Sequence, residues 1–159
     1  MSAGRQIVIE DPRSPDVVAL LETHLSFARA ASPPEDVHAL DVNGLLSPDV
    51  TFFSLRDDGT LLGVGALREI DPTHGEIKSM HTAEIARGNG VGGAMLEHLL
   101  ATARSRGYER VSLETGTMDE FAAARSLYTR AGFEVCPPFA DYFVSPHSVC
   151  MTLELGTST

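Results

Sequence analysis

A glycine-rich run, Arg87-Gly88-Asn89-Gly90-Val91-Gly92-Gly93, is the part of this sequence whose residue types and spacing point most directly to chemistry. It follows a strand-like segment and precedes a helix-like one, residues 94–106. The first N–H groups of a helix have no partner within it and carry a partial positive charge. Glycines let such a backbone approach a bulky anion, and Arg87 adds a planar, permanently charged donor. The run therefore predicts a site for a phosphorylated cofactor.

The segments that must position this run follow strand and helix patterns in a defined order. Short apolar runs closed by Gly, Pro or Asp predict strands at residues 6–10, 51–55, 61–70, 76–82, 110–115, 133–136 and 148–155. Helices are expected at residues 15–28, 35–41, 94–106 and 119–130. Ser14 and Pro15 suit the cap and first position of the first helix. The order β-α-α-β-β-β-α-β-α-β-β, with no repeat or linker, indicates one mixed α/β domain over residues 1–159.

The composition is that of a globular chain with an excess of acidic residues. The 159 residues suffice for one core, and 43% of them are hydrophobic. Twelve Lys+Arg against 22 Asp+Glu give a formal net charge of −10, which argues against nucleic acid or a membrane as partner. A polyanionic cofactor must then be held by local backbone dipoles and a few arginines. A cationic substrate, such as an amine, is mildly favoured by the overall field.

The ends and the cysteines of the chain indicate a cytoplasmic protein. Residues 1–10 lack the basic segment and apolar run of a signal peptide, and no stretch approaches 18 apolar residues. Cys136 and Cys150 are the two cysteines, and without a secretion signal they are expected to be reduced. The six histidines are scattered, so we expect no metal site.

The glycine run also fits a dinucleotide pattern, which must be weighed first. Gly88-x-Gly90-x-x-Gly93 matches the dinucleotide fingerprint, and Glu114 falls about where its ribose-binding acid belongs. In that fingerprint the strand leads almost directly into the first glycine, whereas residues 83–87 intervene here. The chain also ends in adjacent strands rather than further βαβ units. A phosphate loop of the nucleotide-hydrolase kind would need Gly-Lys-Ser/Thr, which is absent. Another family is therefore favoured.

The alternative pattern, Arg87-x-x-Gly90-x-Gly92 after a strand, resembles the GCN5-related N-acetyltransferase (GNAT) superfamily, which moves an acetyl group from acetyl-CoA to an amine. Residues 76–92 are similar to its fourth strand and pyrophosphate loop. Residues 124–133 look like its Ala-x-x-Leu-Tyr-x-x-x-Gly-Phe signature, and the predicted order of elements is also the superfamily's order. Finer features at residues 75–80, 113–116 and 137–142 are similar to a bacterial branch whose substrates are poorly defined.

The resemblance implies a fold and a cofactor site. The fold is a single mixed α/β N-acetyltransferase domain with a central, mostly antiparallel sheet and helices on both faces. The cofactor is acetyl-CoA, acting as co-substrate, with its pyrophosphate on the glycine run and its pantetheine arm paired to the edge of the preceding strand. The cofactor-binding residues implied are Met80, His81, Thr82, Arg87, Gly88, Asn89, Gly90, Val91, Gly92 and Gly93.

Direct acetyl transfer needs a neutral amine and therefore a base. A lysine-like amine has a pKa near 10.4, so roughly one molecule in a few thousand is neutral at pH 7. A base must remove the proton, directly or through water. Glu76, on the strand beside the expected thioester, is the catalytic candidate, and Glu114 and His81 are held in reserve. The structural alternative for Glu76 is an ion pair with Lys78 or Arg68.

The leaving CoA thiolate needs a proton donor, and the resemblance assigns this role to Tyr128. A phenol with an ordinary pKa near 10 stays protonated at pH 7 and can donate. The structural alternative is a core aromatic packed against Phe133. Phe121 stands where many members of the superfamily carry an asparagine, so the contact of that asparagine with the cofactor is not carried over.

The acceptor is expected to be a small-molecule amine selected by residues 25–46 and the loop 137–148, in which Phe139, Tyr142, Phe143 and His147 give a mixed aromatic and polar lining. Arg68 and Lys78 are candidates to hold a carboxylate, which would suit an amino acid-like acceptor. A protein lysine would suit an acidic cleft equally, and a non-catalytic acyl-CoA-binding module is the rival function. Exchange or pairing of the strand 148–155 between two copies would offer a route to a homodimer, because an exposed strand edge is a pairing site.

Overall fold

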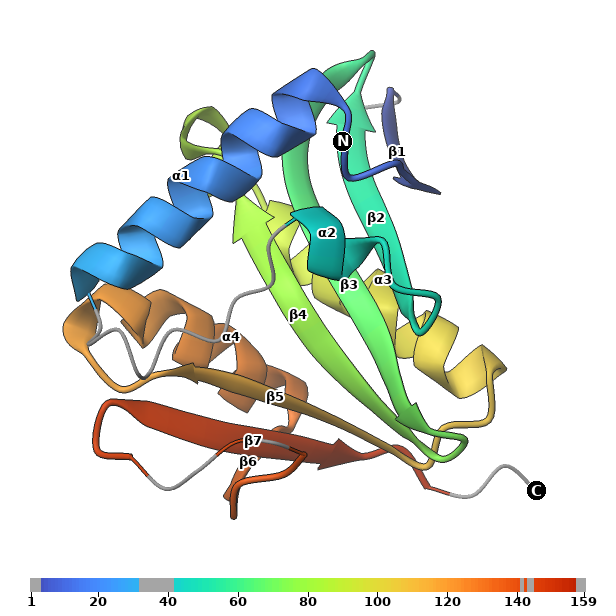
Figure 1. Ribbon diagram of the computed structural model, residues 1–159, viewed down its shortest axis with the longest axis vertical. Coiled ribbons are helices and arrows are strands. Elements are labelled where there is room, and N and C mark those ends of the chain that lie inside the picture. Colours follow the sequence, from blue (N-terminus) through green and yellow to red (C-terminus); the bar gives the residue numbers. More distant parts are fainter. Residues whose placement is uncertain (1–3, 32–41, 141, 143–144, 157–159) are drawn as a thin grey trace.

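The computed structural model describes residues 4–31, 42–140, 142 and 145–156, which form a seven-stranded sheet with helices packed against it (Figure 1). The strands are β1 (Arg5–Ile9), β2 (Val50–Asp57), β3 (Thr60–Asp71), β4 (His74–Thr82), β5 (Arg110–Gly116), β6 (Glu134–Cys136) and β7 (Ser148–Glu154). The helices are α1 (Pro15–Ala31), α2 (Val42–Leu45), α3 (Val91–Ser105) and α4 (Ala122–Ala131), with short 3₁₀ turns η2 (Glu84–Ala86) and η3 (Asp119–Phe121). This is the predicted order, although the helix expected at 35–41 lies outside the described residues.

The sheet is mixed but mostly antiparallel, as expected. Its strand order is β1-β2-β3-β4-β5-β7-β6, and β4 and β5 are the one parallel pair among the described strands. The crossover between those two strands contains α3, which is the connection that a parallel pair requires. No helix in the described part of the chain is long and apolar enough to cross a membrane.

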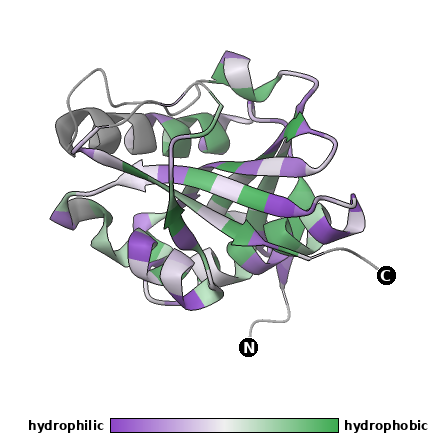
Figure 2. Ribbon diagram, turned by 90° about the horizontal axis from the view of Figure 1, so that it is seen from below, coloured by the Kyte–Doolittle hydropathy of each residue, from purple (hydrophilic) through white to green (hydrophobic). Residues whose placement is uncertain are grey.

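The sheet separates two hydrophobic cores, and Figure 2 shows it as a layer with helices on both sides. The core beneath α1 and α2 contains Val17, Leu21, Leu45, Phe52, Leu61, Val64 and Ala66. The larger core beneath α3 and α4 includes Leu55, Leu67, Ile77, Met95, Leu99, Val111, Leu113 and Tyr128. Gly65 on β3 gives α3 room to approach, because a Cβ there would lie 2.8 Å from Cγ of Met95. Burial of apolar side chains in these two layers supplies the main stabilisation of the fold.

A β-bulge interrupts β4 at Ser79. On β3, Val64 pairs with His81 and Ala66 pairs with Lys78, so two steps on β3 oppose three steps on β4. Ser79 takes a left-handed backbone conformation with φ 54°, which absorbs the extra residue. Side chains that alternate along a strand change face across such an insertion. Lys78 therefore shares the α1 face with Ala66, whereas Met80 packs against the core on the α3 face.

β4 and β5 separate soon after they meet. Among the described residues they pair at three positions, and Glu76 opposite Ser112 is the last of them. Beyond Glu76 the strands diverge, as Figure 1 shows between the labels β4 and β5. The edge of β4 from Ile77 to Thr82 that faces β5 thus has no neighbouring strand within the described sheet.

The C-terminal strand β7 is not at the edge of the sheet, although the hypothesis of a homodimer through this strand requires an exposed edge. β7 lies between β5 and β6, and residues 150–152 of it pair with β6. The expectation of an exposed edge at 148–155 was wrong because strand order depends on long-range pairing that periodicity does not encode. The short strand β6 occupies that end of the sheet, which is one way in which proteins limit edge-to-edge association.

Candidate active site

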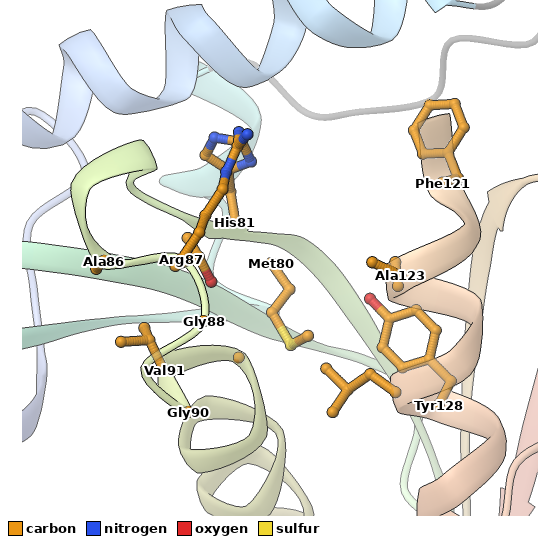
Figure 3. A pocket seen from close by; sticks show the side chains of 14 residues that line it. Met80, His81, Ala86, Arg87, Gly88, Gly90, Val91, Phe121, Ala123 and Tyr128 are labelled. Carbon is orange, nitrogen blue, oxygen red and sulfur yellow. The ribbon is translucent and has the colours of Figure 1, made fainter. Parts of the chain in front are cut away.

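A cavity of about 410 Å³ lies beside the part of β4 that no longer pairs with β5, and it brings most of the sequence-predicted cofactor residues together. Its walls come from the end of β4, the glycine run, the first residues of α3, and α4 (Figure 3). The lining residues are Met80, His81, Thr82, Ala86, Arg87, Gly88, Gly90, Val91, Gly92, Phe121, Ala123, Ala124, Leu127 and Tyr128. Its volume is in the range of small-molecule and cofactor sites. Of the predicted cofactor residues, Asn89 and Gly93 are not among those that line it.

The glycine run forms the turn that leads into α3. Gly88 and Gly90 have φ of +80° and +78°, a conformation that side chains with a Cβ rarely adopt, and nothing lies within 4 Å of a Cβ at either position. Their glycine identity is thus required by the backbone rather than by packing. Gly90 is the N-cap of α3 and makes no side-chain capping bond. The free N–H groups of the first helical turn therefore point out of the helix beside the cavity, where an anion would be stabilised.

Asn89 closes this turn from the side. Its Nδ2 donates to the carbonyls of Ala86 at 3.2 Å and Arg87 at 3.3 Å, and its own carbonyl accepts from Arg5 at 3.0 Å. Asn89 therefore holds the shape of the loop instead of facing the cavity. The side chain of Arg87 is exposed, and Figure 3 shows it extending from the loop in the same direction as His81.

The open edge of β4 forms the second wall. The bulge at Ser79 turns Met80 towards α3 and α4, and Figure 3 shows its side chain directed towards Tyr128. His81 and Thr82 continue the wall to the end of the strand. Backbone groups on an open strand edge can pair with an extended ligand that carries amides.

Tyr128 of α4 lies at the inner end of the cavity. The residue is 6% exposed, and its ring packs against Phe133 with centroids 5.8 Å apart. Burial raises the pKa of Tyr128 to about 12. The phenol therefore stays protonated throughout the neutral range and is a hydrogen-bond donor. Both sequence interpretations of Tyr128 are compatible with this geometry, since one ring packs in the core while its hydroxyl borders the cavity.

Two contacts that sequence reasoning missed shape the α4 side. Phe121 lines the cavity and lies against Gly116, where a Cβ would come within 2.2 Å of the Phe121 ring. Arg125 donates from Nη1 to the carbonyls of Gly116 at 2.7 Å and Met118 at 2.8 Å. These bonds fix the connection from β5 to α4, and the one sequence signal for them is the glycine at the end of β5.

Glu76 lies on the opposite face of β4, among charged partners. Its side chain is fully buried and, among the described residues, does not line the cavity. Arg68 Nη1 and Lys78 Nζ each lie 3.3 Å from one of its carboxylate oxygens, Oε1 and Oε2 respectively. Both ion pairs named as the structural alternative are therefore present. Arg68 also pairs with Asp49 at 3.2 Å and is 32% exposed, whereas Lys78 is 7% exposed.

Tyr142, in the loop between β6 and β7, contacts Glu76 and Lys78. Its hydroxyl lies 2.5 Å from Oε2 of Glu76 and 2.7 Å from Nζ of Lys78. Burial, followed by the charge of Glu76, raises the pKa of Tyr142, so the phenol stays protonated and donates to the carboxylate. Phe139 packs on the Tyr142 ring with centroids 5.0 Å apart. The remaining aromatic residue expected in this lining, Phe143, lies outside the described residues.

The two reserve bases lie in different surroundings. His81 lines the cavity at the end of β4. Glu114 is half-buried on β5, opposite Cys150 of β7. The structure thus divides the predicted site between two faces of the sheet: Tyr128 and the glycine run on the α3 face, and the Glu76 cluster on the α1 face.

Comparison with known proteins is consistent with this arrangement. The family model of the acetyltransferase (GNAT) family matches residues 17–133. The uncharacterized N-acetyltransferase YsnE of Bacillus subtilis is 47% identical over 149 residues, which cover 94% of this chain and 99% of YsnE. The uncharacterized N-acetyltransferase YedL of Escherichia coli is 46% identical, with 94% of each chain covered. The crystal structure of a candidate acyl-CoA N-acyltransferase from Klebsiella pneumoniae superposes with a TM-score of 0.79 at 28% identity, covering 95% of this chain and 97% of that one.

The mostly antiparallel seven-stranded sheet with its helices has an acyl-CoA N-acyltransferase fold, and this chain belongs to the acetyltransferase (GNAT) family. It is an N-acetyltransferase, as the resemblance of its motifs implied.

Proposed function

We propose that the cavity between β4 and α4 binds acetyl-CoA and that the chain transfers its acetyl group directly to the amine of a small molecule. The observation that carries this proposal is the cavity itself. Its lining combines the glycine turn before α3, the open edge of β4 and Tyr128. We infer that these three elements meet the pyrophosphate, the pantetheine amides and the thioester of acetyl-CoA, respectively.

On the donor side, the helix N-terminus and Arg87 would hold the pyrophosphate, and the edge at Met80 to Thr82 would pair with the pantetheine arm. Tyr128 would then donate a hydrogen bond to the sulfur as the C–S bond breaks. A phenol whose pKa is about 12 is a weaker acid than a thiol, whose pKa is near 8.5, so this bond stabilises the thiolate without full proton transfer. The thiolate takes a proton from solvent after release.

On the acceptor side, Glu76 would accept the proton of the incoming ammonium, directly or through water, before nitrogen attacks the thioester carbonyl. Its position supports this role, because it is the last β4 residue paired with β5 and so stands where the strands part. Of the two cations paired with Glu76, Arg68 is the more exposed, and we assign it to a substrate carboxylate. An amino acid-like acceptor follows from that assignment.

The first experiment is a thermal shift of the protein against acetyl-CoA, CoA and NAD in parallel. A ligand at about one hundred times its Kd adds roughly 2.7 kcal/mol of stability, which raises the Tm of a domain this size by several degrees. We expect shifts with acetyl-CoA and CoA and none with NAD. A panel of amines, read by release of the CoA thiol, then identifies the acceptor. Binding without thiol release from any amine would favour the non-catalytic module.

A matched pair of glycine variants tests the location of the cofactor. Gly88→Ala and Gly59→Ala each force a Cβ onto a backbone with positive φ in open surroundings, at a cost of about 1–2 kcal/mol. Only Gly88 borders the cavity, since Gly59 is in the β2–β3 turn. We expect Gly88→Ala to weaken acetyl-CoA binding at least tenfold and Gly59→Ala to leave it unchanged. Equal effects of the two substitutions would place the cofactor elsewhere.

A further inference from the structure

The two cysteines of the chain lie directly opposite each other on neighbouring strands. Cys136 is the last residue of β6, and the antiparallel register pairs it with Cys150 of β7. Both thiols are free. Directly opposite residues of an antiparallel pair have Cα atoms about 4.5 or 5.5 Å apart, and their side chains project from the same face of the sheet. Both separations fall within the range of about 4.4–6.8 Å that a disulfide bridges.

We propose that Cys136 and Cys150 form a redox modification site, which a low-molecular-weight disulfide converts to an intramolecular disulfide. The Cys136 thiolate attacks one sulfur of this oxidant and displaces its first thiol, which leaves a mixed disulfide on Cys136. The Cys150 thiolate then attacks the Cys136 sulfur and displaces the second thiol. The two cysteines lose two electrons and two protons in total, and the oxidant takes them up as it is reduced to two small thiols.

The place of β6 in the sheet allows the bond to form. This strand is three residues long and lies at the end of the sheet, with β7 as its one neighbour among the described strands. A small shift of β6 towards β7 therefore disturbs no other strand pairing. Cys136 is half-buried and Cys150 is 6% exposed. The oxidant thus reaches Cys136 first, and the second step takes place within the molecule.

The acidity of the two thiols sets the conditions for oxidation. Burial raises the pKa of Cys136, and burial raises the pKa of Cys150 to about 11. The thiolate is the attacking species, so both cysteines are mostly in their unreactive form at neutral pH. The thiolate fraction grows about tenfold per pH unit below each pKa. We therefore expect the rate of oxidation to rise steeply between pH 7 and 9.

The bond would close the loop between β6 and β7 into a ring. Cys136 directly precedes this loop, and Cys150 is the third residue of the strand that follows it. Within the loop, the backbone N–H of Phe139 donates a hydrogen bond to the Cys150 sulfur. Such a ring restricts the unfolded chain and raises stability. None of the described residues from 134 to 154 lines the cavity between β4 and α4, so we expect acetyl-CoA binding to be unaffected.

The test is incubation of the reduced protein with oxidised glutathione at about pH 8, where more thiolate is present than at neutral pH. Intact mass and Tm are measured after the glutathione is removed. We expect the mass to fall by two hydrogen atoms and the Tm to rise by several degrees, and dithiothreitol should reverse both changes. An unchanged mass, a glutathionyl group retained on the chain or a disulfide-linked dimer would each overturn the proposal.

Two variants show whether the strand register brings the sulfurs together. Cys136→Ser should abolish the loss of mass and the rise in Tm. Val135→Cys in the Cys136→Ser background is the matched control, because residue 135 is the adjacent position on β6 and pairs with Met151. Adjacent side chains of a strand project from opposite faces. We expect this exposed cysteine to retain a glutathionyl group, whereas a disulfide to Cys150 would contradict the assigned role of the register. Retained thermal shifts with acetyl-CoA show that each variant is folded.

Discussion

Tyr128 combines a structural and a chemical position in one side chain. Its ring belongs to the core beneath α4, where it contacts Phe133, and its hydroxyl borders the cavity. The phenylalanine variant separates the two, because it keeps the ring and removes the donor. We expect Tyr128→Phe to lower kcat tenfold or more while the thermal shift with acetyl-CoA survives. An unchanged kcat would exclude Tyr128 from the chemistry.

The raised pKa of Tyr128 also gives an expectation for the pH profile. Because burial raises this pKa to about 12, the phenol remains protonated up to roughly one unit below that value. The neutral fraction of a lysine-like amine rises about tenfold per pH unit until the pH approaches its pKa near 10.4. We therefore expect kcat/KM for such an acceptor to climb between pH 7 and 9 without a basic limb from Tyr128. A fall in that interval that disappears in Tyr128→Phe would contradict the raised value.

The positions of several of these residues could be predicted from sequence because they depend on local structure. Gly88 and Gly90 are needed for the turn between a strand and a helix that the sequence patterns on either side already predict. The spacing of the signature at 124–133 gives the position of Tyr128. Tyr142 was expected in an acceptor lining, yet its bond to Glu76 spans 66 residues. Such a contact depends on the path of the loop between β6 and β7, which no short-range pattern specifies.

At the scale of the element, the bulge in β4 holds the backbone of Ser79 in a strained, left-handed conformation. Ser79 has φ 54°, is 8% exposed, and its hydroxyl has no hydrogen-bond partner among the described residues. Ser79→Gly relieves the backbone and removes the buried hydroxyl at once. We expect stability to rise by about 1 kcal/mol, or a few degrees in Tm, with acetyl-CoA binding unchanged. Ser79→Val should act in the opposite direction, and equal Tm values for the two variants would refute the strain.

The strands and helices themselves were largely predictable, whereas the bulge and the strand order were not. Alternation and helical spacing located each described strand and the helices α1, α3 and α4 to within a few residues, and Ser14 with Pro15 marked the start of α1. The sequence around Ser79 carries no glycine or asparagine that would signal a left-handed residue. Its conformation follows from pairing with β3. The placement of β7 inside the sheet likewise depends on partners that lie far away in the sequence.

At the scale of the whole molecule, the net charge of −10 opposes the approach of a polyanionic cofactor. The groups that we propose to hold it, Arg87 and the helix N-terminus, act over short distances, whereas the repulsion acts over the whole surface. Added salt screens the long-range term first. We expect the association rate of CoA, measured by stopped flow, to increase severalfold between 10 and 150 mM NaCl. A rate that falls with salt would mean that a local positive patch governs encounter.

The bulge at Ser79 gives a single strand two independent surfaces. Met80 lines the cavity on one face, and Lys78 belongs to the Glu76 cluster on the other, only two positions away. Substitutions at the Glu76 cluster can accumulate with little effect on the cavity, because the side chains of Lys78 and Met80 project from opposite faces of β4. Under the proposed function, a lineage that descends from this fold can change the amine it modifies and keep the same acetyl donor. The first substitutions in such a lineage would be expected on the α1 face of β4 and in the loop that contains Tyr142.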